Sequence, residues 1–551
     1  MMTVEVDEPV AAGRRSVPSW AGGLHPPGLP STEKLLTEGG DSRIEVKGGY
    51  GLNSYGCPPL PDEDLIALGS STASVVSAQG FDAAARLRRR LLAAGHGEPC
   101  ADSYARELDR VRRELLELCG VRDVPGLEVV FGASGTDLHL IAAQLVSNAA
   151  HTPTRVIMVD AAETGSRVAA ALSGCHFSSR AALGAPVMEG QRITRGRTIE
   201  IVNVAIRLAD GTPRIPSEVD IEVEELVAEA TAKGWRSLLI LVDVSKTGLI
   251  APSPARVVDL HHRYTDTLDV FVDGCQFRIA PATLRVYLEQ GFMVALTGSK
   301  FITGPTFSGA LLIPAQAARR FHSHNLPAAL RNYSSRGDWP RGWSAARSLQ
   351  STANFGLLLR WEAALQELRA FRSVPEGVVS GFLQTFAGAV RDRLVGDPIF
   401  EPLLVPELDR GPLFAAPCWD RVQTIFPFLL HYPSNRGGRV LLNRNETLHV
   451  HRLLQLDLAG GRAGAMGGIA ALRCQMGQPV TSGERGGVAV SALRLCASAR
   501  LVVEAACGRE SGAAVIERAL TALDKTAYVV RSLCRPSLQP TRTSRCRVVS
   551  G

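Results

Sequence analysis

Between residues 100 and 320, short and continuously apolar runs alternate with longer segments of helical periodicity. Strands that are apolar at every position, rather than at every second one, are typical of a parallel sheet covered by helices on both faces. The pattern therefore predicts a three-layer α/β domain. The apolar runs stand in LEVVFG (127–132), TRVIMVD (154–160), SLLILVDVS (237–245), LDVFVDGCQF (268–277), FMVALTGSKF (292–301) and SGALLIP (308–314).

The pattern changes after about residue 340, where a long amphipathic segment precedes helices mixed with short strands such as VSALRLCAS. This mixture favours a smaller α+β domain. Residues 177–237 are less regular and are interpreted as a hairpin inserted into the parallel domain. The expected organisation is a disordered tail (1–30), an N-terminal segment packing on the small domain or on a dimer partner (31–100), the large domain (101–340), the small domain (341–538) and a second tail (539–551).

Composition excludes several classes of protein. Sixty basic residues against 54 acidic ones give a net charge of only +6, and no basic block dominates, so nucleic-acid binding is not expected. No apolar run is long enough to span a bilayer, and the N-terminus lacks the apolar core of a secretory signal. Eleven scattered cysteines without a CxxC pair or zinc spacing predict free thiols, no metal site and a cytoplasmic location.

Candidate chemistry gathers where the strands of the predicted sheet end. Asp273 ends one apolar strand, Gln276 follows it, and Lys300 stands just past the next strand. In open α/β sheets, ligands bind at this carboxyl edge. A buried lysine there can form a Schiff base, and an aspartate can keep a pyridine nitrogen protonated.

A glycine and a threonine stand upstream at a strand-to-helix turn. Gly135 and Thr136 open the helical segment after the first strand, where free amides and a hydroxyl suit a phosphate. Each feature alone also fits a plain helix cap or loop. Their order, each at a strand end of one sheet, is the specific signal.

Residues 125–315 resemble fold-type I enzymes that use pyridoxal 5'-phosphate (PLP), within the class V aminotransferase and cysteine desulfurase-like group. The resemblance implies the aspartate-aminotransferase fold, a homodimer, an amino acid substrate, and catalysis through a Schiff base at Lys300 and a quinonoid intermediate. It implies Asp273 at the pyridine nitrogen. The cofactor contacts that it implies are Gly135, Thr136, Ser245, Asp273, Gln276, Thr297, Ser299 and Lys300.

The chain departs from the group's pattern at three positions. Ser299 stands where the group has a histidine before the lysine, and Ser245 stands where the turn has an asparagine. The histidine that usually stacks on the cofactor ring is replaced by Thr164. These departures argue against ordinary desulfurase chemistry and leave proton transfer to Lys300.

The substrate side has two candidate arginines. Arg494, in a strand of the expected small domain, resembles the arginine that binds the substrate carboxylate in this fold, and Arg473 is its competitor. Cys474 precedes Arg494 by twenty residues, as the persulfide cysteine of desulfurases precedes its arginine. A mobile thiol beside cations would have the lowered pKa that reactivity requires.

Three functions therefore remain in competition. The first is an aminotransferase or carbon–heteroatom lyase acting on an α-amino acid, which needs no dedicated thiol. The second is a cysteine desulfurase that uses Cys474. The third is a non-catalytic protein that keeps the fold as a binding module, which the intact Lys300 argues against.

Overall fold

The computed structural model describes most of the chain between residues 28 and 533. The described ranges are 28–46, 51–94, 100–149, 152–194, 196–413, 418–433, 438–460, 465–508 and 510–533. The expected tail at 539–551, and all but the last three residues of the one at 1–30, lie outside them.

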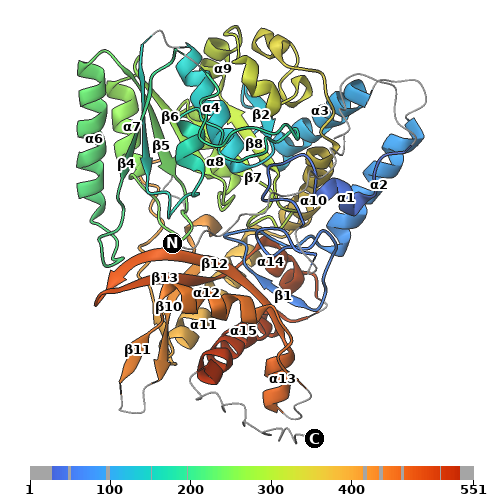
Figure 1. Cartoon of the computed structure of the whole chain (residues 1–551), viewed down its shortest axis with the longest axis vertical. Helices are drawn as coiled ribbons and strands as arrows, with labels where there is room; N and C mark the ends of the chain where they lie inside the picture. Colours follow the sequence, from blue (N-terminus) through green and yellow to red (C-terminus); the bar gives the residue numbers. More distant parts are fainter. Residues whose placement is uncertain are drawn as a thin grey trace, which may run out of the picture.

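A seven-stranded sheet forms the centre of the large domain (Figure 1). Strand β8 runs antiparallel to its neighbours β2 and β7, and the other pairings are parallel. Strands β3, β6, β7 and β8 are buried at every residue, as expected for a sheet covered on both faces. In sheet order the strands are β2 (Glu128–Gly132), β8 (Gly309–Ile313), β7 (Met293–Thr297), β6 (Leu268–Gly274), β5 (Arg236–Val242), β3 (Thr154–Val159) and β4 (Ile199–Val204).

Helices cover this sheet, and one of them is almost wholly buried. Helix α4 (Gly135–Ala149) packs against β2, β3, β7 and β8, and it is buried from Thr136 to Ser147 because its sequence is apolar around most of its circumference. Its N-terminus is thereby fixed at the carboxyl edge of the sheet. The other helices of the domain are α5 (Val168–Leu172), α6 (Pro216–Ala232), α7 (Pro254–Arg263), α8 (Pro281–Glu289) and α9 (Ala315–Phe321).

The expectation of an inserted hairpin at 177–237 is wrong for most of the segment, where antiparallel pairing is limited to isolated bridges such as that of Arg207 with Pro213. Strand β4 is an edge strand of the main sheet and pairs in parallel with β3, from Thr154 beside Ile199 to Val159 beside Val204. Glu200 and Asn203 lie in this edge strand, which is only half-buried along most of its length. Helix α6 then returns the chain to β5, so this segment is an ordinary parallel unit of the fold.

The small domain is built on a second sheet with strand order β1-β12-β13-β10-β11, with β9 beside β10. It lies below the large domain in Figure 1, with α15 packed beneath it. Its strands are β1 (Leu65–Leu68), β9 (Phe400–Pro402), β10 (Ile425–Pro433), β11 (Arg439–Leu441), β12 (Arg473–Arg485) and β13 (Val488–Cys496). Its helices are α11 (Glu376–Val395), α12 (Arg444–Leu454), α13 (Ala465–Ala471), α14 (Ala499–Ala506) and α15 (Gly512–Leu533).

The N-terminal segment joins both domains. Strand β1 adds to the small sheet, in parallel with β12. The buried guanidinium of Arg360 donates to the carbonyl oxygen of Gly39 over 2.8 Å, which ties the segment to the long helix α10. Helices α1 (Thr32–Leu36), α2 (Ala78–Ala94) and α3 (Cys100–Leu118) come early in the chain, and α10 is the helix Phe355–Arg372. Short 3-10 turns later in the chain span Ala328–Asn332, Arg336–Asp338, Ser344–Ser348 and Trp419–Arg421.

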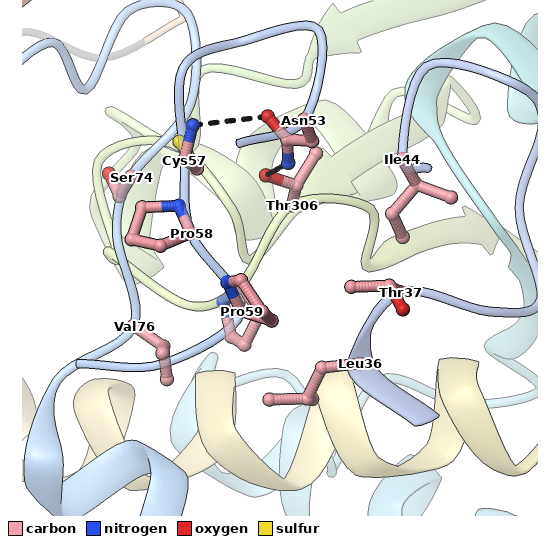
Figure 2. A pocket seen from close by; sticks show the side chains of 11 residues that line it. Leu36, Thr37, Ile44, Asn53, Cys57, Pro58, Pro59, Ser74, Val76 and Thr306 are labelled. Atoms are coloured by element: carbon pink, nitrogen blue, oxygen red, sulfur yellow. Dashed lines mark hydrogen bonds between the residues drawn. The ribbon is translucent and has the colours of Figure 1, made fainter. Parts of the chain in front are cut away.

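The same segment covers the loop that follows Lys300 (Figure 2). The amide of Asn53 donates to the hydroxyl of Thr306 over 3.1 Å, and its oxygen accepts from the backbone N–H of Cys57 over 3.1 Å. The cavity between these residues and Leu36 measures only about 20 Å³, which is room for a single water molecule. The N-terminal segment therefore packs closely over this side of the large domain.

Within the described ranges, no helix combines the length and the apolar character that crossing a lipid bilayer requires.

Candidate active site

The expected site residues meet where β2, β6 and β7 end. A Cβ added to Gly135, the first residue of α4, would lie 2.7 Å from Sγ of Cys275 and 3.6 Å from Cγ2 of Thr297. Only glycine allows this approach between the helix N-terminus and the two strand ends. Three segments that are far apart in sequence thus share one corner of the sheet.

Backbone strain is concentrated around this corner. In the described part of the chain, four residues other than glycine have positive φ: Val244 (63°), Phe277 (54°), Thr303 (66°) and Phe307 (74°). A β-branched or aromatic residue rarely adopts this conformation, and such strain often accompanies functional sites. Each of the four lies within seven residues of Ser245, Gln276 or Lys300.

Asp273 is a buried carboxylate at the end of β6. Its Oδ1 accepts from the backbone N–H of Cys275 over 3.1 Å, and its Oδ2 lies 3.3 Å from Nε2 of His139. Burial alone would raise the pKa of this carboxyl, but His139, Lys300 and the Cys275 side chain together hold it well below its usual range. Asp273 is therefore an anion across the physiological range and can hold a proton on a facing nitrogen.

His139 escaped the sequence analysis because it stands in an apolar helix. It lies on α4 one turn after Gly135, and its ring is 4.7 Å from the ring of Phe271. Its Nδ1 lies 2.7 Å from the carbonyl oxygen of Gly135, and its Nε2 faces Asp273 at ion-pair distance without the alignment of a hydrogen bond. The only signal in the sequence was a histidine four residues after the glycine of the turn.

Lys300 lies in the loop after β7, next to Asp273 and Cys275. Burial lowers the pKa of its ammonium, Arg494 and Arg278 lower it further, and Asp273 opposes them. The loop is fixed because Ser74 donates to the carbonyl oxygen of Lys300 over 3.0 Å. A low pKa gives the uncharged amine that nucleophilic attack on a carbonyl needs.

Gln276 has one unsatisfied polar atom. Its Nε2 donates to the carbonyl oxygen of Ser71 over 3.0 Å, whereas its buried Oε1 has no partner among the described residues. A buried acceptor without a donor costs free energy unless a ligand supplies the donor. Gln276 therefore presents an acceptor to whatever occupies the site.

The N-terminus of α4 carries hydroxyl groups and a cation. Nη2 of Arg43 lies 3.3 Å from Oγ1 of Thr136 and 3.4 Å from Oγ of Ser134. Arg43 also forms an ion pair of 2.5 Å with Asp41. The first amides of a helix have no intrahelical partner and attract anions. Arg43, which comes from the N-terminal segment, adds a guanidinium that motif spacing could not reveal, and Asp41 balances its charge.

Two of the expected phosphate contacts stand at the end of β7 and in the loop that follows it. Thr297 and Ser299 are both buried there. Oγ1 of Thr297 donates its proton to the carbonyl oxygen of Cys275 over 2.6 Å. The hydroxyl can therefore accept a further hydrogen bond but has no second proton to donate. Ser299 stands one residue before Lys300 on the same side of the sheet edge.

Ser245 lies beside the site, and its hydroxyl is bound by another residue. It donates to Oε2 of Glu163 over 2.7 Å, and Thr247 donates to the same carboxylate over 2.7 Å. Arg207 forms an ion pair with Glu163 over 2.6 Å. Burial raises the pKa of Glu163, but the contacts with Arg207, Thr247 and Ser245 outweigh burial and lower it. The hydroxyl of the neighbouring Thr164 is buried without a partner among the described residues.

The two candidate arginines occupy different environments. Arg494 is 1% exposed, and its Nη1 donates to the carbonyl oxygen of Lys246 over 3.1 Å. Its Nη2 donates to Oγ1 of Thr72 over 2.8 Å and to the carbonyl oxygen of Gln478 over 2.5 Å, whereas its Nε has no partner in the described structure. Burial lowers the pKa of Arg494 to about 10. Arg473 instead forms an ion pair of 2.6 Å with Asp62, at the start of β12. Only Arg494 lies among the residues around Lys300.

The expectation of a mobile Cys474 thiol with a lowered pKa is wrong. Cys474 lies inside β12, where it pairs with Ile66 of β1, and its side chain is fully buried. Burial raises the pKa of the thiol to about 11, and Lys525 only partly opposes this effect. The sequence could not reveal this environment, because the parallel pairing of β1 with β12 joins residues about 400 positions apart.

Comparisons with known proteins bear on the fold alone. No family model matches the chain, and no curated protein matches it in sequence. Solved structures do match. The cysteine desulfurase CsdA from Escherichia coli is 15% identical with a TM-score of 0.50, over 84% of this chain and 95% of that one. A variant of C-DES with glycine covalently linked to its PLP cofactor is 14% identical with a TM-score of 0.50, over 86% of this chain and 99% of that one. The chain therefore has the fold of PLP-dependent enzymes of fold type I, as the sequence analysis predicted.

Proposed function

We propose that the chain is a PLP-dependent enzyme that acts on an α-amino acid and cleaves a carbon–heteroatom bond. The observation that carries this proposal is the approach of Lys300 and Asp273 at adjacent strand ends, beside the N-terminus of α4. An amine with a lowered pKa next to a permanent carboxylate is the pair that this cofactor requires. The intact Lys300 disfavours a non-catalytic binding protein.

The residues at this corner fit the cofactor. Lys300 would hold it covalently, and Asp273 would face its pyridine nitrogen. The unsatisfied Oε1 of Gln276 would accept from its ring hydroxyl. The helix N-terminus with Thr136 and Arg43, together with Ser299, would hold its phosphate.

The bound cofactor would supply an electron sink for the bond broken at the substrate, and this chain would supply orientation and proton transfer. Arg494 would bind the substrate carboxylate through a guanidinium whose Nε has no partner in the described structure. Lys300, once released, would take and return a proton at Nζ, because its lowered pKa favours the uncharged amine. The buried surroundings would exclude water.

Carbon–sulfur cleavage is the favoured reaction, because the chain shares its fold with a cysteine desulfurase. Sulfur transfer through Cys474 is the weaker variant, since that thiol is buried in a strand with a raised pKa. A lyase that releases its sulfur product directly needs no such thiol. Transamination is the second candidate, because it uses the same lysine and aspartate and requires nothing further from the chain.

The test starts with the cofactor. Purified protein supplied with PLP is expected to be yellow and to lose that absorbance on borohydride reduction, with the label on Lys300 in peptide mass spectrometry. A panel of amino acids is then incubated with the enzyme while 2-oxo acid, ammonia and sulfide are measured. Release of a 2-oxo acid with ammonia supports a lyase, whereas conversion only in the presence of an added 2-oxo acid supports an aminotransferase. A protein that binds no PLP would end this proposal.

A further inference from the structure

The serine-rich turn of residues 70–74 is held against the candidate site. It links β1 to α2 in the N-terminal segment. The carbonyl oxygen of Ser71 accepts from Nε2 of Gln276 over 3.0 Å, and the hydroxyl of Ser74 donates to the carbonyl oxygen of Lys300 over 3.0 Å. The turn therefore contacts two of the residues that are expected to hold the cofactor, one from each side of its middle residue.

Thr72, in the middle of this turn, accepts two hydrogen bonds at its hydroxyl oxygen. Nη2 of Arg494 donates to Oγ1 of Thr72 over 2.8 Å, and the backbone N–H of Gln478 donates to the same oxygen over 3.1 Å. A hydroxyl group has two lone pairs and one proton, so both of its acceptor positions are occupied. The described residues offer no acceptor for the remaining proton. Thr72 is only half-buried, so a ligand can reach this donor.

A glycine opposite Arg494 allows the guanidinium to lie against the turn. Gly477 of β12 pairs with Arg494 of β13 across the small sheet. A Cβ added to Gly477 would lie 3.1 Å from Cζ of Arg494 and 2.8 Å from Oγ of Ser71. Any larger residue at this position would push the guanidinium and the turn apart, which is the kind of close approach for which strands use glycine. The contact between Arg494 and the turn is therefore built into the small sheet.

Arg494 alone does not offer a free two-pronged fork to a carboxylate. Both protons of its Nη2 are used, one by Thr72 and one by the carbonyl oxygen of Gln478, which accepts over 2.5 Å. Its Nη1 donates to the carbonyl oxygen of Lys246 over 3.1 Å. Its Nε is buried without a partner in the described structure. The Nε–H of Arg494 and the hydroxyl proton of Thr72 are therefore both available to a ligand at this point.

Two donors on adjacent groups match the two oxygens of one carboxylate. Nε and Nη2 share an edge of the planar guanidinium, which is the edge that pairs with carboxylates in proteins. Thr72 is bound to Nη2 and so lies next to Nε, with a proton in place of the one that Nη2 has given up. A neutral carboxamide has only one oxygen to accept, and its amino group would face a donor.

We propose that Thr72 binds the substrate α-carboxylate together with Arg494. Nε of Arg494 donates to one carboxylate oxygen, and the Thr72 hydroxyl donates to the other while it accepts from Nη2. This inference rests on the proposed PLP-dependent function. It makes Thr72 a binding residue that completes a fork of which the arginine provides only one prong, and it gives the N-terminal segment a direct part in selecting substrates with a free carboxylate.

The experiment measures binding separately from turnover. Holoenzyme is reduced with borohydride, which fixes the cofactor on Lys300 and stops chemistry, and ligands are titrated by calorimetry. The matched ligands are propionate and propanamide, which have nearly the same shape and differ in charge and in the number of acceptor oxygens. Thr72→Val is expected to weaken propionate binding at least about tenfold, since a hydrogen bond to a charged group contributes that much. Its affinity for propanamide should stay within about twofold of wild type.

Two further variants separate the hydroxyl from packing. Thr72→Ser keeps the donor and is expected to bind propionate within about threefold of wild type. Thr72→Ala should lose as much affinity as the valine variant, and it replaces that variant if valine prevents folding. A crystal structure of the valine or alanine variant shows where the guanidinium lies. Arg494 is expected to keep its place, because the carbonyl oxygens of Lys246 and Gln478 still accept from it.

Failure of this inference can be told from failure of the proposed function. A protein that forms no coloured, borohydride-sensitive complex with PLP contradicts the function itself. A protein that does form it, yet keeps its propionate affinity when Thr72 is replaced by valine or alanine, overturns only the role of Thr72. The role is also overturned if wild-type protein binds propionate no more tightly than propanamide. A guanidinium of Arg494 that turns away in the variants would make Thr72 a positioning residue and contradict the proposed contact.

Discussion

Nε2 of His139 lies 3.3 Å from Oδ2 of Asp273, and Nδ1 of the same ring lies 2.7 Å from the carbonyl oxygen of Gly135. A carbonyl oxygen can only accept, so Nδ1 carries a proton and the orientation of the ring is fixed. His139 thus joins the turn at the start of α4 to the carboxylate at the end of β6. It is a positioning residue, which acts through Asp273 rather than on a ligand.

Replacing His139 with leucine tests this relationship. Without the imidazole, Asp273 loses the largest of the interactions that lower its pKa. A bound pyridine nitrogen is then protonated less fully. Turnover is expected to fall about tenfold for each unit by which the carboxyl pKa rises. The absorbance of the bound cofactor as a function of pH reports the change without reference to activity. Unaltered spectra and turnover within twofold of wild type would contradict the role.

Asp273→Asn removes the charge itself. This variant is expected to retain part of its affinity for PLP and to lose turnover by about three orders of magnitude or more, because a neutral pyridine is a poor electron sink. Affinity is measured by titration of the apoprotein, and turnover is measured with the substrate found in the amino acid panel. Near-normal activity would assign Asp273 to a structural cap of the turn at Cys275.

Continuous apolar strands and the order of Gly135, Asp273 and Lys300 made the central sheet and the corner of the site predictable from sequence. Such signals are local, since each depends on residues within one strand and the turn after it. Strand β4 was misjudged because an edge strand carries polar residues on its open face, as an exposed hairpin does.

Arg43, His139 and Thr72 show what sequence patterns cannot provide. Arg43 reaches the helix N-terminus from a segment more than ninety residues away, and no periodicity encodes that contact. His139 stood in a run of apolar residues, where a histidine is usually part of the core. Thr72 occupied a serine-rich turn, where a hydroxyl is usually solvated, and only the hydrogen bond from Arg494 reveals its position.

The proposed homodimer is a further prediction. Enzymes with this fold are expected to form two-fold dimers, and closed two-fold symmetry is the most frequent arrangement among homo-oligomers. Light scattering on a sizing column should give twice the mass of the chain at micromolar concentration. A monomer with full activity would refute the dimer.

Among the ion pairs of the described residues, the buried pair of Arg410 and Asp243 should be the most costly to break. Both side chains are at most 2% exposed, and the guanidinium donates to both carboxylate oxygens over 2.7 and 2.8 Å. Arg410→Met is expected to lower the free energy of unfolding by about 3–5 kcal/mol, because it leaves a buried carboxylate unpaired. Arg263→Met, which breaks surface ion pairs with Asp259 and Glu224, is the control and should cost at most about 1 kcal/mol. Urea unfolding of both variants decides, and equal losses would contradict the expectation.

Cys474 provides the sharpest separation between sulfur transfer to the protein and direct release. A desulfurase must pass sulfur to a thiolate, whereas burial raises the pKa of the Cys474 thiol to about 11. At pH 8 only about one thiol in a thousand would be ionised, so alkylation by iodoacetamide should be slow and should accelerate only as the pH approaches 11. Cys507, which is exposed, is the matched control and should react at pH 8. Peptide mass spectrometry measures both rates in one sample.

Cys474→Ala is expected to keep more than half of wild-type turnover, while Lys300→Ala loses essentially all of it. A persulfide on Cys474 after incubation with cysteine, together with an inactive alanine variant, would establish the desulfurase instead.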